Sequence, residues 1–110
     1  MEVKREKFSI STDHKKLQLD VIHHYLTEEA YWTTGRTLEM TVKSIKNSLC
    51  FGVFEKEAQI GFARVVTDYT LFAYLCDVFI LDEYQGQGLG KWLTETILKA
   101  LDEELSLIHI

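Results

Sequence analysis

Apolar and polar positions along the chain follow two periods, and these predict both strands and helices. Runs that alternate apolar with polar residues, or that are rich in β-branched and aromatic side chains, are typical of strands. The predicted strands are Phe8–Ser11, Leu49–Phe54, Ile60–Thr67 and Leu71–Leu81. Short polar turns separate the last three, so we expect them to form an antiparallel meander. Nearly every residue of Leu71–Leu81 is apolar, which predicts a central strand covered on both faces.

Apolar residues at helical spacing predict three helices around these strands. The first predicted helix follows the N-cap oxygens of Ser11–Asp13 and ends near Glu28. The second spans Leu38–Asn47, and the third runs from Gly88 to about Glu104. In the second helix, Leu38, Val42 and Ile45 are predicted to lie on one apolar face. The chain therefore has the pattern of an α/β domain of the α+β type.

Length and composition restrict the class of protein further. A chain of 110 residues, 46% hydrophobic and 26% charged, suits one globular domain spanning residues 1–110. The formal net charge of −5 argues against a nucleic-acid partner, since broad attraction to phosphates needs excess positive charge. No apolar stretch approaches the roughly 20 residues of a membrane span, and no secretory signal is recognisable. Cys50 and Cys76 stand in apolar runs, which predicts buried free thiols and a reducing cytoplasmic location.

The segment with the most chemical information is the glycine-rich loop Gln85–Lys91, which follows a predicted strand and opens a predicted helix. A helix N-terminus presents backbone N–H groups without acceptors and the positive end of the helix dipole. Glycines allow an anion to approach these groups without a Cβ in the way. The loop therefore predicts a local anion site that needs no basic surface.

Two common phosphate-binding motifs do not fit this loop. The Walker A motif requires Ser or Thr after the lysine, but Trp92 follows Lys91, and Gln85 stands where its first glycine belongs. The dinucleotide-binding pattern G-x-G-x-x-G has Lys91 at its third glycine. It also requires a second parallel strand that the remaining chain is too short to supply.

The loop resembles the Q/R-x-x-G-x-G/A loop of GNAT acetyltransferases, with Gln85, Gly88 and Gly90 at the three defining positions. The order of the predicted elements from Phe8 to Leu101 also follows that family. The resemblance implies a mainly antiparallel mixed sheet flanked by helices. It also implies acetyl-CoA as co-substrate and an amine, on a small molecule or a peptide, as acceptor. The cofactor contacts implied are Val78, Phe79, Ile80, Gln85, Gly86, Gln87, Gly88, Leu89, Gly90 and Lys91.

One departure from the family concerns the C-terminus. The family usually continues into a fifth strand, a further helix and two more strands, and only Leu105–Ile110 could supply part of these. We therefore expect a C-terminally truncated domain that self-associates as a homo-oligomer. A non-catalytic module that binds coenzyme A or a protein partner is the alternative to an acetyltransferase.

Candidate catalytic residues lie in the last predicted strand. A buried Asp77 would have a raised pKa and could act as general base, although a structural carboxylate is the simpler interpretation. Tyr74, on the opposite face, is a second candidate that could equally line the core or a cleft. The resemblance implies that Trp32 and Arg36, between the first two helices, border the acceptor site, and local packing of Trp32 over the sheet is an equal alternative. Arg64, in a strand, is predicted to pair with an acid or reach the cleft, and no metal site is expected.

Overall fold

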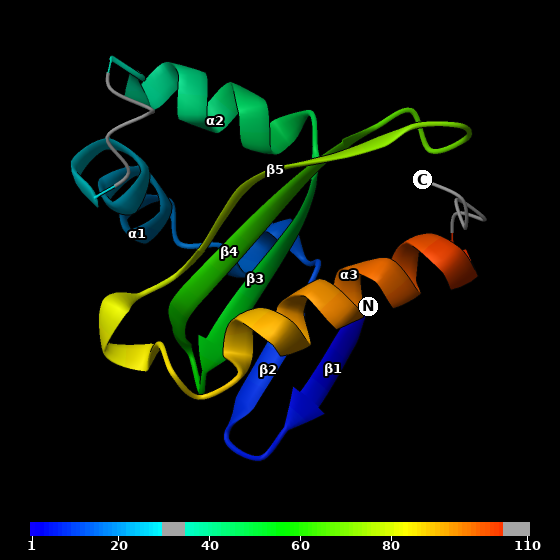
Figure 1. The fold of residues 1–110 in the computed structure, drawn as a ribbon. Helices are drawn as coiled ribbons and strands as arrows, with labels where there is room; N and C mark the ends of the chain where they lie inside the picture. Colours follow the sequence, from blue (N-terminus) through cyan, green and yellow to red (C-terminus); the bar gives the residue numbers. More distant parts are fainter. Residues whose placement is uncertain (30–34, 105–110) are drawn as a thin grey trace.

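The computed structural model describes residues 1–29 and 35–104, which form one five-stranded sheet flanked by helices (Figure 1). The strands are β1 (Glu2–Arg5), β2 (Phe8–Ser11), β3 (Leu49–Glu55), β4 (Ala58–Thr67) and β5 (Ala73–Ile80). They lie in the order β1-β2-β3-β4-β5, and every neighbouring pair is antiparallel. The predicted meander is therefore confirmed, and a β1–β2 hairpin that the sequence pattern did not indicate extends it.

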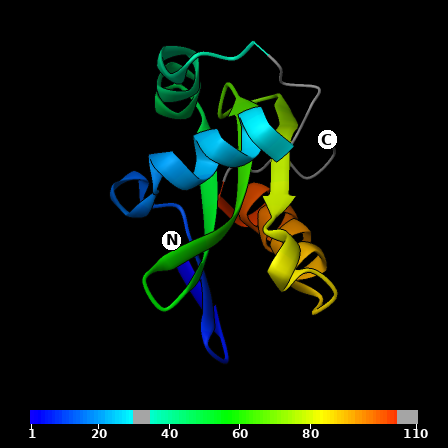
Figure 2. The ribbon, with the colours of Figure 1, turned by 90° about the vertical axis from the view of Figure 1, so that its left-hand side faces the viewer.

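Helices cover both faces of the sheet (Figure 2). The helices are α1 (Leu19–His24), which continues as a π-helical turn over Tyr25–Glu29, α2 (Leu38–Lys46) and α3 (Leu89–Glu104). The long helix α3 lies on one face, and α1 and α2 lie on the other. This arrangement confirms the predicted mixed class of helices around a mainly antiparallel sheet.

Each face of the sheet has its own apolar cluster. Under α3, the buried helix residues Leu89, Leu93 and Ile97 pack against strand residues that include Phe51 and Val53. Under α1, the buried cluster comprises Ile22, Leu26, Cys50, Phe62 and Phe79. Side chains alternate across a strand, so successive residues at the end of β5 reach different clusters. Phe79 joins the cluster under α1, whereas Ile80 joins the one under α3.

The predicted central position of the last strand is wrong. β5 is an edge strand of the described sheet, and Tyr74 and Leu75 are exposed. The helices bury β5 mainly toward its end, at Phe79 and Ile80. A continuous apolar run shows that a strand suits burial, but it does not identify the element that covers it.

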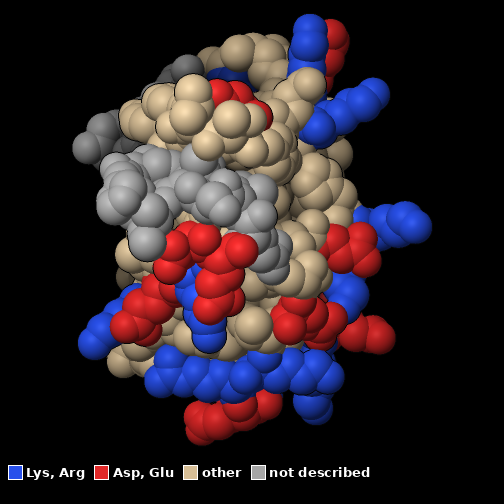
Figure 3. All heavy atoms as spheres, turned by 90° about the vertical axis from the view of Figure 1, so that its right-hand side faces the viewer, with Lys and Arg blue, Asp and Glu red and all other residues tan. Residues whose placement is uncertain are grey.

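Figure 3 shows a mostly uncharged surface around the tip of the β4–β5 hairpin, with charged side chains gathered over the lower half.

The predicted apolar face of the second helix is only partly buried, because Ile45 alone of its three residues packs against the cluster under α1. Leu38 and Val42 are exposed, whereas Thr41 is fully buried. Thr41 Oγ1 lies 2.8 Å from His23 Nδ1, so a polar contact joins α2 to α1. A hydrogen bond between helices therefore sets the rotation of α2, which an apolar pattern does not report.

The packing of α3 predicts a contrast between two leucines on the same helix. Leu93 is fully buried, whereas Leu98 is 61% exposed. Leu93→Ala is expected to lower the free energy of unfolding by about 2–5 kcal/mol, because it removes buried methylenes and leaves a cavity. Leu98→Ala, the matched control, should change it by less than about 0.5 kcal/mol. Urea denaturation of both variants measures the difference, and equal losses would contradict this packing.

Candidate functional site

The candidate site begins where β5 ends and the chain turns toward α3. A 3₁₀ turn at Asp82–Tyr84 follows the strand. The side chain of Gln85 then closes the base of the loop, because its Nε2 donates to the Ile80 carbonyl at 2.9 Å and to Asp82 Oδ1 at 3.2 Å. The loop that carries the glycines is therefore anchored to the strand that precedes it.

Two glycines of the loop have backbone conformations that favour glycine. Gly86 has φ of 84° and Gly88 has φ of 79°, both in the left-handed region. The first helical hydrogen bond of α3 runs from the Trp92 amide to the Gly88 carbonyl at 3.0 Å. The N–H groups that precede Trp92 in the first turn therefore have no acceptor within the helix. A Cβ placed on Gly86, Gly88 or Gly90 would meet no heavy atom within 4 Å, so the space beside these residues is open.

A cavity of about 370 Å³ joins the end of β5 to the start of α3. Its lining residues are Tyr25, Val78, Phe79, Ile80, Tyr84, Gln85, Gly86, Gly88, Leu89 and Gly90. Most of the predicted cofactor contacts thus lie around one space, while Gln87 and Lys91 do not line it. The cavity combines a strand segment with the N-terminus of a 16-residue helix.

Tyr25 lines this cavity, and sequence analysis did not identify it. It begins the π-helical turn after α1, and its ring stacks on Phe79 with centroids 4.2 Å apart and planes 11° apart. In the sequence, Tyr25 occupies a helical apolar position like any core residue. Only the packing of α1 across β5 places it at the cavity.

Tyr84 connects the loop to the rest of the sheet. Its hydroxyl donates to Glu55 Oε1 at 2.8 Å, and Glu55 also pairs with Lys7 at 3.0 Å. The hydrogen bond from Tyr84, followed by that from Lys7, lowers the pKa of Glu55. The Tyr84 ring also makes an edge contact with Phe8, with centroids 6.3 Å apart. Residues from β2 and β3 therefore hold the loop from outside the cavity.

An irregularity in the sheet sets the position of Asp77. The β4–β5 register pairs Ala63 with Val78 and Arg64 with Cys76, so Asp77 is an extra residue in β5. Such bulges redirect a side chain and increase the local twist. The Asp77 side chain is 6% exposed and lies between two guanidinium groups.

The two arginines bind Asp77 from different elements. Arg36, just before α2, donates from Nη1 to Oδ2 at 3.1 Å and from Nη2 to Oδ1 at 3.2 Å. Arg64, on β4, donates from Nε to Oδ2 at 2.7 Å and from Nη1 to Ser48 Oγ at 3.1 Å. The prediction that Arg64 pairs with an acid is confirmed. We call Arg36, Asp77 and Arg64 the arginine cluster.

The predicted raised pKa of Asp77 is wrong. Burial raises this pKa, but the hydrogen bonds and charges of Arg36 and Arg64 outweigh burial, so the pKa is lowered. The sequence showed a carboxylate in an apolar strand but not the two cations that fold against it. A carboxylate with a lowered pKa is a weak proton acceptor, which disfavours Asp77 as general base.

Comparison with known proteins identifies the family of this fold. The family model described as the acetyltransferase (GNAT) family matches residues 18–110. The chain belongs to the GNAT family. The resemblance seen in the glycine loop and in the order of elements is thereby confirmed.

Individual relatives agree with this assignment. The Gibberella zeae protein FG08082, which carries an acetyltransferase name, is 31% identical over 88% of this chain and 66% of its own length. A solved GNAT-family structure from Xanthomonas campestris pv. campestris (xcc2953) is 37% identical, with a TM-score of 0.82, covering 93% of this chain and 69% of that one. The PaiA N-acetyltransferase of Thermoplasma acidophilum, solved with coenzyme A, has a TM-score of 0.62 at 19% identity, covering 87% of this chain and 72% of that one. This chain thus spans just under two thirds of the length of the fungal relative.

Other predicted residues of this GNAT chain lie away from the cavity or outside the description. Tyr74 is 61% exposed on β5, so its predicted place in a core or cleft wall is not what the structure shows. Trp32 lies outside the described residues. Cys50 is a buried thiol whose pKa burial raises to about 12, whereas Cys76 is only half-buried, which corrects the prediction for it.

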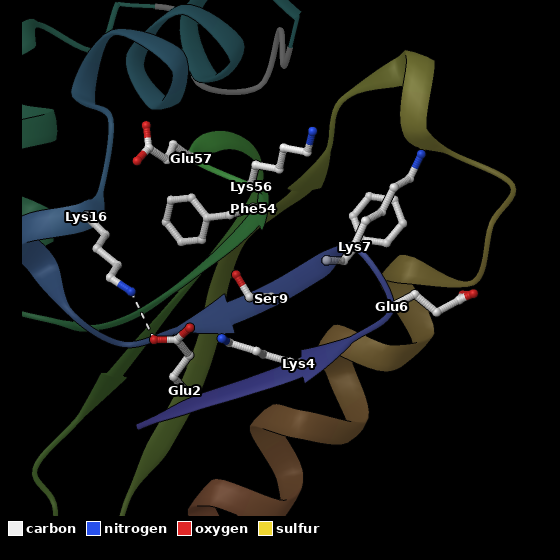
Figure 4. Close-up of a pocket in the computed structure, with 10 residues that line it drawn as sticks. Glu2, Lys4, Glu6, Lys7, Ser9, Lys16, Phe54, Lys56 and Glu57 are labelled. Carbon is white, nitrogen blue, oxygen red and sulfur yellow. Dashed lines mark hydrogen bonds and ion pairs between the residues drawn. The ribbon is translucent and has the colours of Figure 1, made fainter.

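A larger cavity of about 530 Å³ lies beside the β1–β2 hairpin (Figure 4). Charges of both signs line it, and Lys16 and Glu2 pair there at 2.9 Å. No glycine loop or helix of eight residues or more contributes to its wall. The smaller cavity at the GNAT loop is therefore the candidate site. Within residues 1–29 and 35–104, no group of three or more potential metal ligands is present, and no helix could cross a membrane.

The arginine cluster predicts how stability depends on pH. Asp77→Asn is expected to lower the free energy of unfolding by on the order of 3 kcal/mol at pH 7, because it leaves two partly buried guanidiniums without their carboxylate. The native pKa of Asp77 is lowered below its ordinary value of 3.8. The contribution of Asp77 to the free energy of unfolding is therefore complete at pH values well above 3.8 and disappears as the pH falls through the native pKa. Chemical denaturation of both proteins between pH 7 and 2.5 should show the gap closing. Exposed Asp20→Asn is the control, and a gap that is absent at pH 7 would contradict the ion-pair geometry.

Proposed function

We propose that this chain binds acetyl-CoA and transfers the acetyl group to an amine by direct attack. The observation that carries this proposal is the cavity itself, which joins the end of β5 to the open first turn of α3. Membership of the GNAT family supports acetyl transfer in general. Acetyl-CoA as the donor and an amine as the acceptor are what we propose beyond it.

The residues around the cavity fit coenzyme A. The open space at Gly86, Gly88 and Gly90 allows a pyrophosphate to reach the amides of the first turn of α3. Pantetheine carries amide groups and can add to the outer side of β5 at Val78–Ile80, in the manner of an extra strand. The coenzyme A complex of the Thermoplasma protein supports this placement at the level of the fold.

Acetyl-CoA supplies a thioester: the amine nitrogen bonds to the carbonyl carbon, the carbon–sulfur bond breaks, and the thiolate takes up the proton that the amine loses. The chain must hold the amine beside this carbon in its neutral form, although a lysine-type amine has a pKa of about 10.4 in water. Backbone N–H groups near Val78 are suited to stabilise the developing oxyanion. Asp77 acts in this proposal as a positioning residue that holds Arg36 and Arg64.

One observation favours binding without turnover as the second candidate. The titratable side chains that line the cavity in the described part of the chain are Tyr25 and Tyr84. Tyr84 donates its hydroxyl to Glu55, so it is committed to holding the loop. A chain that binds coenzyme A tightly but acetylates no amine would establish this candidate.

Substitution of Gly90 tests the proposed coenzyme A site. Gly90 is helical and lines the cavity, so Gly90→Leu should preserve or improve helix stability while its side chain obstructs the ligand. We expect calorimetry to show coenzyme A affinity reduced by roughly 100-fold or more, the effect of about 3 kcal/mol, and acetyl transfer to an amine panel to fall with it. Gly88→Val should also abolish binding, but its positive φ strains the backbone as well. Thr94→Leu, one turn further along α3, is the control, and equal affinity of Gly90→Leu and wild type would refute the site.

Self-association is a second part of the proposal. The outer edge of β5 is unpaired within the described sheet, also in the segment before Val78 that pantetheine would leave open, and Leu71, Phe72 and Tyr74 are 83%, 53% and 61% exposed. An apolar strand with a free edge favours pairing with another copy.

We expect sedimentation velocity to show a dimer that dissociates on dilution. Tyr74→Lys should shift the equilibrium toward monomer, because a lysine on an edge strand opposes pairing. Leu98→Lys, on the exposed face of α3, should leave the monomer–dimer equilibrium unchanged. A monomer at every concentration would show that β5 does not pair.

A further inference from the structure

The arginine cluster carries more positive than negative charge. Two guanidinium groups share the single Asp77 carboxylate, which leaves one positive charge unbalanced. The side chains of Arg36 and Arg64 are only 17% and 15% exposed. Among the side chains that the structure describes, which lie in residues 1–28 and 35–103, neither arginine forms another ion pair, so these side chains do not neutralise the excess charge.

Donor groups also remain available in the cluster. Each guanidinium has five N–H groups in a planar fork. Arg36 uses its two Nη atoms on Asp77, while Arg64 uses Nε on Asp77 and Nη1 on Ser48. The Nη2 group of Arg64 and the Nε group of Arg36 have no protein acceptor in the described part of the chain. A partly desolvated cation whose donors lack acceptors among the described residues is a suitable site for a carboxylate.

The position of the cluster relative to the cavity indicates which ligand would meet it. The glycine loop lies beyond the C-terminal end of β5, and Val78, Phe79 and Ile80 line the cavity between that loop and Asp77. At about 3.3 Å per strand residue, Asp77 lies about 10 Å back from Ile80 along β5. A coenzyme A whose pyrophosphate is at the loop would extend its thioester toward this end of the strand. The cluster is therefore placed to meet the acceptor rather than the cofactor.

We propose that the arginine cluster binds a carboxylate of the acceptor, so that this chain acetylates amino carboxylates: amino acids or related compounds with a free carboxylate. The proposal rests on the proposed acetyl transfer and names its substrate class. In this arrangement Asp77 keeps the two guanidiniums apart and oriented, and their unbalanced charge selects an anionic substrate. An amine acceptor of the same length that has no carboxylate would leave that positive charge unpaired.

Matched acceptors test this selection. The panel consists of ω-amino carboxylates with two to five methylenes and the carboxamide of each, so that both members of a pair carry the same amine. Acetyl transfer is measured for each pair, and each compound is also titrated into the protein saturated with coenzyme A. We expect the carboxylate to exceed its carboxamide in kcat/KM and in affinity by roughly 10- to 100-fold for at least one length.

Arg64→Gln removes the excess charge while leaving the Arg36–Asp77 pair balanced. It should reduce the preference for the carboxylate to near unity, and Arg64→Lys, which keeps the charge, should restore part of it. Asp77→Asn keeps both positive charges but removes the carboxylate that orients them, so it should weaken the preference while transfer to the carboxamides continues. Loss of transfer to both members alike, in a protein that still binds coenzyme A, would assign Asp77 to proton transfer instead. Lys56→Gln, an exposed lysine beside the other cavity, controls for a general effect of charge.

The outcomes separate this inference from the proposed function. Absence of coenzyme A binding in the same titrations would refute the proposed function itself. Normal coenzyme A binding with equal rates and affinities for both members of every pair, or with no member bound, would overturn the carboxylate site alone. A preference that survives Arg64→Gln would also overturn it, because the selection would then come from elsewhere.

Discussion

The packing of the first turn of α3 against the sheet is the constraint on which the site depends. Leu89, the first residue of the helix, is already buried, and Leu93 and Ile97 continue the same face. The helix N-terminus therefore cannot move away from the end of β5. Its N–H groups without helical acceptors remain beside the cavity, where they form the candidate anion site of a chain of net charge −5.

The loop that joins β5 to α3 is held on both of its sides. Within the loop, Gln85 ties the turn to the end of the strand. From outside, Glu55 accepts the hydroxyl of Tyr84 while Phe8 contacts its ring. Because the ordering of the loop is completed during folding, less conformational entropy is left to lose when a ligand binds.

The bulge in β5 has an electrostatic consequence. Regular pairing would alternate side chains across β5 without interruption, but the extra residue, Asp77, lies between arginines from two other parts of the chain. Arg36 precedes α2 and Arg64 lies on β4, so the cluster ties the α2 region to the sheet. The same contacts lower the pKa of the carboxylate and make it a structural anion.

The sequence determined the elements whose signals are local. The glycines of Gln85–Lys91 require a particular backbone, and the spacing of Leu89, Leu93 and Ile97 defines a helix face. Both features were therefore visible in the chain, and they predicted the candidate anion site and the family. The meander of β3, β4 and β5 was visible for the same reason, since short polar turns connect adjacent antiparallel strands.

Tertiary structure decided everything that depended on residues far apart in sequence. The ionisation of Asp77 depends on Arg36, which is 41 residues away, and the rotation of α2 depends on the contact of Thr41 with His23. The exposure of Tyr74 and Leu75 on β5 likewise depends on which part of the strand other elements cover, not on the apolar pattern of the strand itself. Hydropathy reports whether a side chain favours burial. Which charges pair, and which residues are covered by other elements, depends on the distant segments that folding brings together.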